Sequence, residues 1–230
     1  MEIGRSAAKS YAYLLGVFLG DGCITSLGRK IVFKLNTIDE DFAFATKNAF
    51  DIFNAKSKIY TYSVKKSSKP NHQLICECDE IIERLNNDTQ RKLILPVSKN
   101  DELDIRKQVI IGLMDSEGFV AGNKSNPTNR KYYMGYKSCD PWVDDLISIM
   151  QSVGLKLGKR QTEKPRLPHY KAPTRFHIKM QSWIDSGLKF NIKRKQDRVD
   201  EWASIGPYEM RSLNPRKLSS TTNTLDLERG

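Results

Sequence analysis

The order of apolar and polar residues predicts the same series of elements twice along the chain. Apolar runs at 13–20 and 109–114 predict one helix in each series. Residues 30–36 alternate as a half-buried strand does, with Ile31, Phe33 and Leu35 on the apolar side, and 131–137 stand at the corresponding place in the second series. A helix, two strands and a short helix follow in each series, expected at 39–55, 58–64, 72–78 and 79–87, and at 140–153, 155–161, 175–180 and 181–188.

This repetition indicates an α+β fold built from two pseudo-symmetric halves. Each half is expected to run helix, two strands, helix, two strands, helix, which gives two antiparallel sheets with helices on one side. The predicted boundaries are 1–88 for the first repeat, 89–103 for a linker, 104–218 for the second repeat and 219–230 for a polar tail.

A motif at the start of each half is the clearest repeated feature. It reads YLLGVFLGDG over 13–22 and VIIGLMDSEG over 109–118. Small residues recur in it at helical spacing, namely Ala12, Gly16 and Gly20 in the first copy and Gly112 and Ser116 in the second. Because glycine inside a helix costs about 1 kcal/mol relative to alanine, we expect these positions to let the two helices pack closely together.

Each motif also ends in an acid followed by glycine, at Asp21-Gly22 and Glu117-Gly118. A buried helix with a glycine cap is one interpretation of this ending. However, an acid at a helix C-terminus is unfavourable, and pairing of the helices would add repulsion between the two acids. A divalent cation would remove both costs. Oxygen ligands without nearby cysteine or histidine favour Mg²⁺, or else Mn²⁺, with the backbone carbonyls of Gly20 and Ser116 as further candidate ligands.

The composition is that of a globular chain with excess positive charge. Of 230 residues, 39% are hydrophobic and 28% charged, which excludes whole-chain disorder and coiled coil. The chain has 38 Lys and Arg against 27 Asp and Glu, a net charge of +11, which favours a polyanionic partner such as DNA, RNA or an anionic membrane. A membrane partner is not expected, because the longest apolar run falls far short of the roughly 20 residues that cross a bilayer.

The cysteines and the N-terminal residues bear on the compartment. Among the four cysteines, Cys76 and Cys78 form the one close pair, and no second pair or spaced histidines complete a zinc site. We interpret all four as buried thiols of an intracellular protein. The first ten residues lack the apolar segment of a secretory signal. We therefore expect a protein of the cytoplasm, nucleoid or an organelle that is not secreted.

The two motifs, with matching strands between them, resemble those of LAGLIDADG homing endonucleases of the single-chain, two-motif type. Residues 14–22 and 110–118 stand for the two motifs, and the resemblance covers about residues 10 to 200. Asp21 and Glu117 fall at the family's metal-binding catalytic position. The sixth motif position departs from the pattern, with Leu19 in the first copy and Asp115 in the second.

The resemblance implies a fold and an activity. The paired helices would form the interface between two αββαββα halves, whose antiparallel sheets make a DNA-binding saddle over the major groove. Metal ions held by the two acids would hydrolyse both strands of double-stranded DNA across the minor groove and leave 3′ overhangs. Because one chain carries both helices, we expect a monomer on one long, asymmetric target.

The resemblance further implies basic or amide residues beside the scissile phosphates. Asn36 and Lys137 occupy equivalent strand ends, while Arg91-Lys92 and Lys193-Arg194 each follow a closing short helix. The stretch around Lys193 resembles the family's basic segment better than the stretch around Lys92. For each of these residues a solvated surface charge is the alternative. The expected catalytic set is Asp21, Glu117, Lys193, Lys137, Asn36 and Lys92.

The polar sides of the strands supply the expected DNA contacts. Most such contacts go to phosphates and carry affinity, while Arg and Lys can also read guanine edges. The candidates are Lys30, Lys34, Lys131, Tyr133, Lys156, Arg160, Arg175, His177 and Lys179.

Two other functions explain the charge and the repeat. One is an RNA-binding maturase on the same scaffold, which assists intron splicing. The other is a DNA-binding regulator that does not cut. Neither function requires an acid in both motifs, so an endonuclease is the interpretation that uses every repeated feature.

Overall fold

The computed structural model describes residues 4–63, 69–122, 132–163 and 172–212 of the chain, with side chains described as far as residue 204. The first half consists of α1 (Arg5–Leu19), β1 (Cys23–Leu27), β2 (Lys30–Thr37), α2 (Glu40–Asp51), β3 (Lys56–Tyr62), β4 (Asn71–Glu77) and α3 (Asp79–Asp88). The second half consists of α4 (Leu103–Ser116), β5 (Phe119–Gly122), β6 (Tyr132–Ser138), α5 (Val143–Ser152), β7 (Gln161–Thr162), β8 (Thr174–Ile178), α6 (Met180–Asp185) and α7 (Lys193–Ser212).

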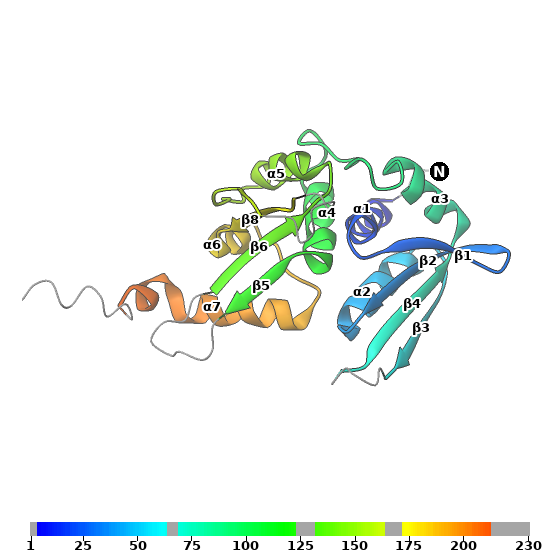
Figure 1. The fold of residues 1–230 in the computed structure, drawn as a ribbon, viewed down its shortest axis with the longest axis horizontal. Coiled ribbons are helices and arrows are strands. Elements are labelled where there is room, and N and C mark those ends of the chain that lie inside the picture. Colours follow the sequence, from blue (N-terminus) through cyan, green and yellow to red (C-terminus); the bar gives the residue numbers. More distant parts are fainter. Residues whose placement is uncertain (1–3, 64–68, 123–131, 164–171, 213–230) are drawn as a thin grey trace, which may run out of the picture.

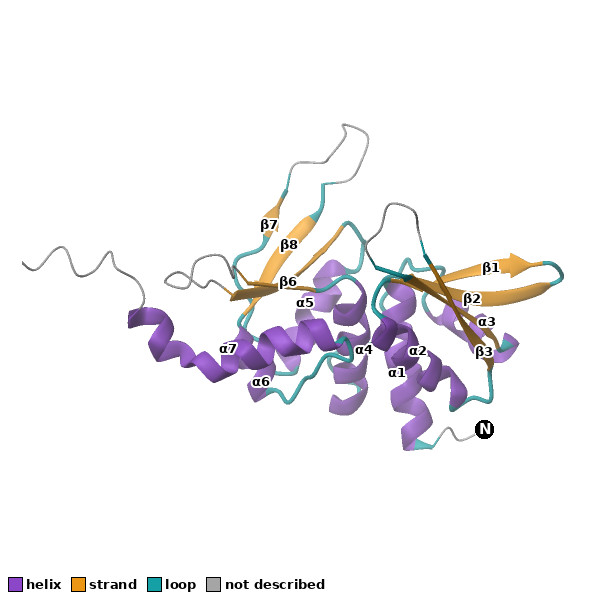
Figure 2. Ribbon diagram, turned by 90° about the horizontal axis from the view of Figure 1, so that it is seen from below, coloured by secondary structure: helices purple, strands orange, loops and turns teal. Residues whose placement is uncertain are grey.

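Each half folds around an antiparallel sheet, and the two sheets share one topology. The strand orders are β1-β2-β4-β3 and β5-β6-β8-β7, so corresponding strands lie at corresponding places. Helices α1 and α4 lie side by side between the sheets (Figure 1). Both sheets lie on the same side of these helices (Figure 2). The predicted α+β fold with two related halves is confirmed. Among the described residues, no helix is long and apolar enough to cross a bilayer.

The close approach of α1 and α4 depends on the glycines that the sequence places in both motifs. A Cβ atom added at Gly16 would lie 2.3 Å from the carbonyl oxygen of Val109, and one at Gly112 would lie 2.3 Å from the carbonyl oxygen of Tyr13. Any larger side chain would therefore push backbone against backbone. The expected packing of the two motif helices is confirmed.

This packing predicts a large effect of one methyl group. Gly112→Ala should lower the free energy of unfolding by about 2 kcal/mol, because the cost of overpacking against backbone, about 3 kcal/mol, exceeds the gain of about 1 kcal/mol in helix propensity. Urea denaturation measures the loss. Gly4→Ala is the control, since a Cβ there meets nothing within 4 Å. Equal stability of the two variants would contradict this account of the interface.

The strand alternation holds for most of β2. Phe33 and Leu35 are fully buried, as predicted, and the Phe33 ring lies 4.9 Å from that of Phe50 in α2. Ile31, however, is 48% exposed, because it lies beside the turn that joins β1 to β2. Val32 is fully buried although it lies on the other face of the strand from Phe33 and Leu35 in the predicted alternation.

The second half departs from the prediction in three places. Residues 155–160 do not form a regular strand; they contact β8 through an isolated bridge of Leu157 with Ile178, and β7 covers two residues alone. The closing helix ends at Asp185, because Gly187 takes a φ of +68°. A long helix after it was not predicted, yet α7 begins at Lys193 and packs against β5.

Two cysteines also differ from the expectation. Cys23 and Cys139 are exposed, since one begins an edge strand and the other lies in the loop after β6. Cys76 is buried in the core, and Cys78 is half-buried. The description of all four as buried thiols is wrong.

Candidate active site

The two motif acids lie where the paired helices end. Helix α1 ends at Leu19, and Asp21 follows after one intervening residue, Gly20, while Glu117 directly follows α4. A Cβ atom at Gly20 would lie 2.4 Å from the Cβ of Ser116 and 3.4 Å from the Cγ of Glu117. The helix ends therefore touch each other and bring the acids of both halves to one place.

The electrostatic surroundings of Asp21 and Glu117 oppose their ionisation. Burial raises the pKa of Asp21, and the charge of Asp39 adds to the rise, while Lys195 and Lys92 oppose it. Burial also raises the pKa of Glu117, with the charges of Asp21 and Asp140 acting in the same direction. The repulsion between the motif acids that the sequence predicts thus acts in the folded chain.

Lys92 lies beside these acids, at the end of the first motif helix. Its Nζ donates hydrogen bonds to the carbonyl oxygens of Gly20 (3.0 Å) and Gly22 (2.6 Å). Burial lowers the pKa of this lysine, against the charges of Asp140, Asp21 and Glu117. Because the Gly20 carbonyl accepts from Lys92, the structure gives this oxygen a partner other than a metal.

Lys195, which the sequence pattern did not predict for this site, occupies the matching place in the second half. Its side chain is 3% exposed, and its Nζ donates to the carbonyl oxygens of Met114 (2.8 Å) and Asp115 (2.6 Å) near the end of α4. Burial lowers its pKa to about 8, while the charges of Asp115, Asp39 and Asp21 oppose this shift. Lys92 and Lys195 each therefore cap the end of one motif helix.

The structure does not bring Lys193 to this centre. The Nζ of Lys193 contacts the carboxylate of Asp197 at 2.7 and 2.9 Å, one helical turn further along α7, and the side chain is exposed. The sequence does contain a signal for the lysine that reaches the helix ends, because Arg91-Lys92 is repeated as Arg194-Lys195. Matching these two pairs selects Lys195 as the counterpart of Lys92, in place of Lys193.

Comparisons with known proteins agree with this architecture. Residues 8–87 match a family model described as a LAGLIDADG-like domain. The fold resembles a solved mesophilic variant of the homing endonuclease I-DmoI, at 16% identity and a TM-score of 0.53, covering 79% of this chain and 94% of that one. It also resembles full-length DUF199/WhiA from Thermotoga maritima, at 13% identity and a TM-score of 0.52, covering 95% of this chain and 68% of that one. No curated protein sequence matches the chain.

The chain has a LAGLIDADG fold. A further solved structure with this fold, I-DmoI in complex with DNA and Ca, covers 79% of this chain and 88% of that one at 16% identity and a TM-score of 0.52. At these identities the likeness shows the fold alone.

Two further aspartates flank the LAGLIDADG acids and had not been expected there. Asp39 and Asp140 each follow the second strand of their half, and the backbone N–H of each donates to a hydroxyl two residues earlier, both at 3.0 Å. Asp39 forms a two-pronged ion pair with Arg194, at 2.5 and 2.7 Å, which joins the halves. Among the described residues, no arginine or lysine forms an ion pair with Asp140.

Asp115, the residue at the sixth motif position of the second copy, forms a buried polar link between α1 and α4. Asp115 is 1% exposed and accepts hydrogen bonds from the hydroxyl of Tyr13 (3.1 Å) and from the side-chain amide of Asn191 (3.0 Å). Burial raises the pKa of Asp115 to about 6, and the hydrogen bonds and Lys195 limit the rise. This carboxylate joins α1 and α4 to Asn191, two residues before α7 begins.

The carboxylates at the helix ends suit a hard divalent cation. Among the described residues, no group of three or more histidine, cysteine or acidic side chains is arranged around a metal position. Asp21 and Glu117 are the side chains that would hold such an ion, with water and phosphate oxygens to complete the shell, as is usual for Mg²⁺. For the Ser116 carbonyl the role of ligand stays a prediction.

Asn36 and Lys137 lie on the outer sides of their sheets and have protein partners there. The Asn36 side-chain oxygen accepts from the amide of Gln73 at 2.9 Å. Lys137 forms an ion pair with Glu163 at 2.5 Å, and Glu163 also contacts Arg175 at 3.3 Å. A catalytic role for Asn36 and Lys137 stays a prediction.

The expected DNA-facing residues lie mostly on the sides of the sheets that point away from the helices. In the second half Arg175, His177 and Lys179 alternate with buried residues of β8, and the rings of Phe119, Tyr133 and His177 contact one another edge to face. Lys30 forms an ion pair with Glu77, and Arg160 forms one with Asp144. Lys34 is half-buried and Lys156 exposed, while Lys131 lies outside the described residues.

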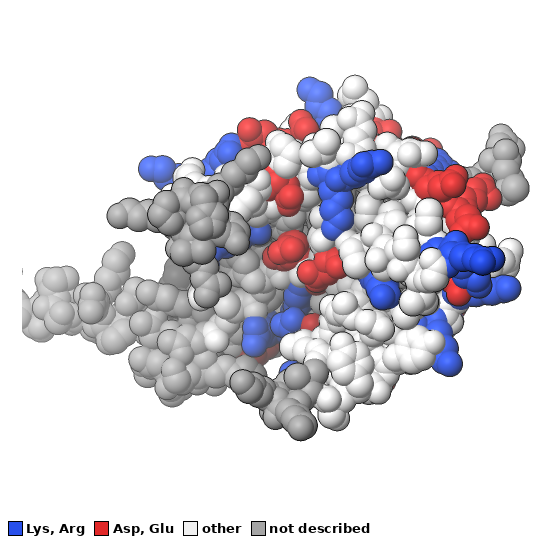
Figure 3. Space-filling view, turned by 45° about the vertical axis from the view of Figure 1, so that its right-hand side comes forward, with Lys and Arg blue, Asp and Glu red and all other residues white. Residues whose placement is uncertain are grey.

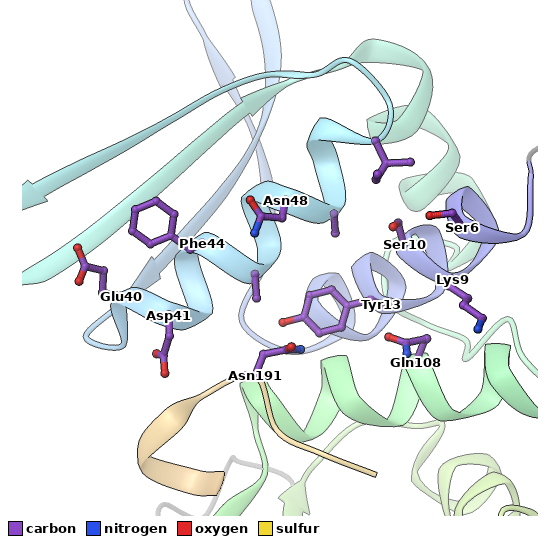
Figure 4. Close-up of a pocket in the computed structure, with 13 residues that line it drawn as sticks. Ser6, Lys9, Ser10, Tyr13, Glu40, Asp41, Phe44, Asn48, Gln108 and Asn191 are labelled. Atoms are coloured by element: carbon purple, nitrogen blue, oxygen red, sulfur yellow. The ribbon is translucent and has the colours of Figure 1, made fainter. Parts of the chain in front are cut away.

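Acidic side chains lie in the middle of one face, with lysine and arginine side chains above and below them (Figure 3). A cleft of about 710 Å³ opens elsewhere, between α1, α2 and α4, and Ser6, Lys9, Tyr13 and Asn191 are among its lining residues (Figure 4). Neither motif acid lines this cleft. The chemistry of the LAGLIDADG acids therefore belongs to the helix ends.

Proposed function

We propose that the chain is a homing endonuclease that makes site-specific double-strand cuts in DNA by metal-dependent phosphodiester hydrolysis and leaves 3′ overhangs. The observation that carries this proposal is the convergence of Asp21 and Glu117 at the touching ends of α1 and α4, between two outward-facing sheets. The solved structures of I-DmoI with similar folds contain DNA with Ca or Mn, which supports DNA as the partner and divalent metal use.

The charges at the helix ends fit phosphodiester hydrolysis. Asp21 and Glu117 would hold Mg²⁺, or Mn²⁺, which supplies activation of water and stabilisation of charge on the phosphate oxygens when bound. Lys92 and Lys195 place positive charge beside both acids. Such preorganised charge stabilises the extra negative charge of a phosphoryl transition state.

The same arrangement supports the remaining parts of the proposal. One chain supplies both motif helices, so we propose a monomer that binds one long, asymmetric duplex. We also propose that the protein acts inside the cell, where chromosomal or organellar DNA is found. RNA is the alternative partner, as it would be for a maturase.

The experiment that tests the function starts from no assumed target. The full chain is incubated with a library of long random duplexes and Mg²⁺, and the cut ends are sequenced. Cleavage at one long site with 3′ overhangs supports an endonuclease. Selective binding without cutting, in Mg²⁺ and in Mn²⁺, would make the chain a DNA-binding regulator, and selective binding of a structured RNA would make it a maturase.

The sheet surfaces predict a salt-dependent contribution of single lysines. Lys34→Ala should weaken DNA binding and reduce the slope of log affinity against log salt by about one, because one phosphate contact is lost. Lys9→Ala is the matched control: it removes the same charge from α1, where Lys9 pairs with Asp104 at 2.8 Å. Binding is measured in Ca²⁺ at several salt concentrations. An equal change of slope in both variants would show a general charge effect and contradict the assignment of Lys34.

A further inference from the structure

The chain makes a left-handed turn soon after α3, at the residues that carry Lys92 to the helix ends. Gln90, Arg91 and Lys92 have φ angles of 45°, 59° and 69°. Residues other than glycine seldom adopt this region of the backbone map, and they keep it only where surrounding contacts hold them there. Three such residues in succession therefore call for an explanation.

Two buried side chains hold this turn. The backbone N–H of Lys92 donates to the hydroxyl of Thr89 at 3.2 Å, and Thr89 is fully buried. The indole N–H of Trp142 donates to the carbonyl oxygen of Lys92, also at 3.2 Å. Trp142 is 1% exposed and directly precedes α5 of the second half. The second hydrogen bond therefore runs from one half of the molecule to the other.

Lys92 is thus fixed at its backbone and at the tip of its side chain. Its carbonyl oxygen accepts from Trp142, and its Nζ donates to Gly20 and Gly22 at the end of α1. Lys195 needs no comparable support, because it lies in the first turn of α7 and its backbone N–H donates to Ile192 at 3.0 Å. The two lysines reach the ends of the motif helices by different means, and only Lys92 depends on a strained backbone.

The contact is one of a reciprocal pair between the halves. Trp142 directly precedes α5 and binds the basic segment of the first half, while Asp39 directly precedes α2 and binds Arg194 in the basic segment of the second. Each basic segment is consequently bonded to the start of a helix in the opposite half.

We propose that Trp142 is a positioning residue for Lys92: its indole N–H keeps the turn of residues 90–92 closed, so that the ammonium group of Lys92 stays at the end of α1. The proposal rests on the proposed function and deepens it, because it makes the basic group of one half depend on the packing of the other.

Trp142→Phe removes the N–H donor and keeps an aromatic ring. We expect single-turnover cutting in Mg²⁺ to slow about tenfold, since one hydrogen bond changes the population of the closed turn by up to about that factor. Trp183→Phe is the matched control. Trp183 is also fully buried in the second half, but its indole nitrogen has no hydrogen-bond partner among the described residues. This control loses the same volume without releasing Lys92, so its cutting rate should stay close to that of the wild type.

Glycine at position 90 separates positioning from a general loss of stability. Gln90 is exposed, and glycine adopts its φ angle without strain. Adding Gln90→Gly to Trp142→Phe should therefore restore the cutting rate. Asn54→Gly is the control, because Asn54 is exposed with a φ of 55° but lies between α2 and β3, and it should restore nothing.

A further variant opens the turn without touching the core. A β-branched residue resists a positive φ angle, so Gln90→Val alone should slow cutting about as much as Trp142→Phe does. An unchanged rate in Gln90→Val would overturn the proposal, because Lys92 would then not depend on this turn.

Trypsin reports on the turn without DNA or metal. It cleaves after Arg91 and Lys92 when the chain opens there, at a rate that follows the population of the open form. Fragments that end at either residue, quantified by mass spectrometry, should form about tenfold faster in Trp142→Phe than in the wild type. They should form no faster in Trp183→Phe, and slowly again once Gln90→Gly is added to Trp142→Phe.

Equal effects of Trp142→Phe and Trp183→Phe on trypsin cleavage would overturn the proposal, as would a failure of Gln90→Gly to restore resistance. An open turn with an unchanged cutting rate would overturn it as well. If the wild type cuts no duplex, the expected trypsin pattern would support the role of Trp142 while the proposed function fails.

Discussion

Asp21→Asn or Glu117→Gln should abolish double-strand cleavage, or leave nicking of one strand, while DNA binding persists. The reason is that the two carboxylates are the protein's share of the proposed metal shell, and metal catalysis is worth several kcal/mol, so a loss of at least about a hundredfold is expected. The measurement is conversion of a supercoiled target plasmid to nicked and linear forms in Mg²⁺. Asp104→Asn is the matched control, because that carboxylate lies at the other end of α4 and pairs with Lys9.

The same variants have an expected effect on stability that follows from the pKa shifts. Both carboxyls have raised pKa values in the folded chain. At a pH above their ordinary pKa of about 4, keeping them ionised in the fold therefore lowers the free energy of unfolding. At pH 7 without metal, each variant should consequently be as stable as the wild type or more stable. The difference should disappear below about pH 4, where the wild-type acids are protonated in both states. A variant that cut both strands at the wild-type rate, or that was clearly destabilised at pH 7, would contradict the metal-site assignment.

Lys195→Met should slow cleavage about a hundredfold, or about 2.7 kcal/mol, with little change in DNA binding. The substitution keeps the apolar length of the side chain and removes the ammonium group that caps α4 beside Asp21. Lys193→Ala is the matched control, because it removes a lysine two residues away that pairs with Asp197. Single-turnover cutting at saturating enzyme gives the rate, and binding is measured in Ca²⁺. Equal slowing by both variants, or loss of binding and cutting together in Lys195→Met, would assign Lys195 to DNA attachment.

The pH dependence of cutting offers a second readout for Lys195. Burial lowers its pKa to about 8, so its charge is present below that pH and is lost above it. The wild-type rate should therefore fall as the pH rises through about 8, and this fall should be absent in Lys195→Met. Stability should change in the opposite sense: between this pKa and the ordinary value of 10.5 the unfolded chain binds the additional proton, so this residue raises the free energy of unfolding as the pH rises.

From sequence alone, the repeated motifs predicted that two helices pack at the centre of the molecule and that two acids lie at their ends. Gly16 and Gly112 lie within apolar helices, where glycine lowers helix stability, so close contact between the two backbones is what explains them. Once the helices pack there, the acids that follow them come together. The strand alternation likewise sets Phe33 and Leu35 into the core. These features were predictable because they depend on helical and strand periodicity, which is local.

Tertiary structure alone decided which polar groups complete the centre. Helix α7 begins at Lys193, and two residues along a helix turn the side chain by about 200°, so Lys193 and Lys195 point to opposite sides although both lie in one basic stretch. The lysine that donates to Gly20 and the arginine that pairs with Asp39 come from segments far away in the chain, which meet these residues only in the folded protein. Hydrogen bonds and charge between such segments follow from the orientation of whole helices and sheets, and local sequence does not encode that orientation.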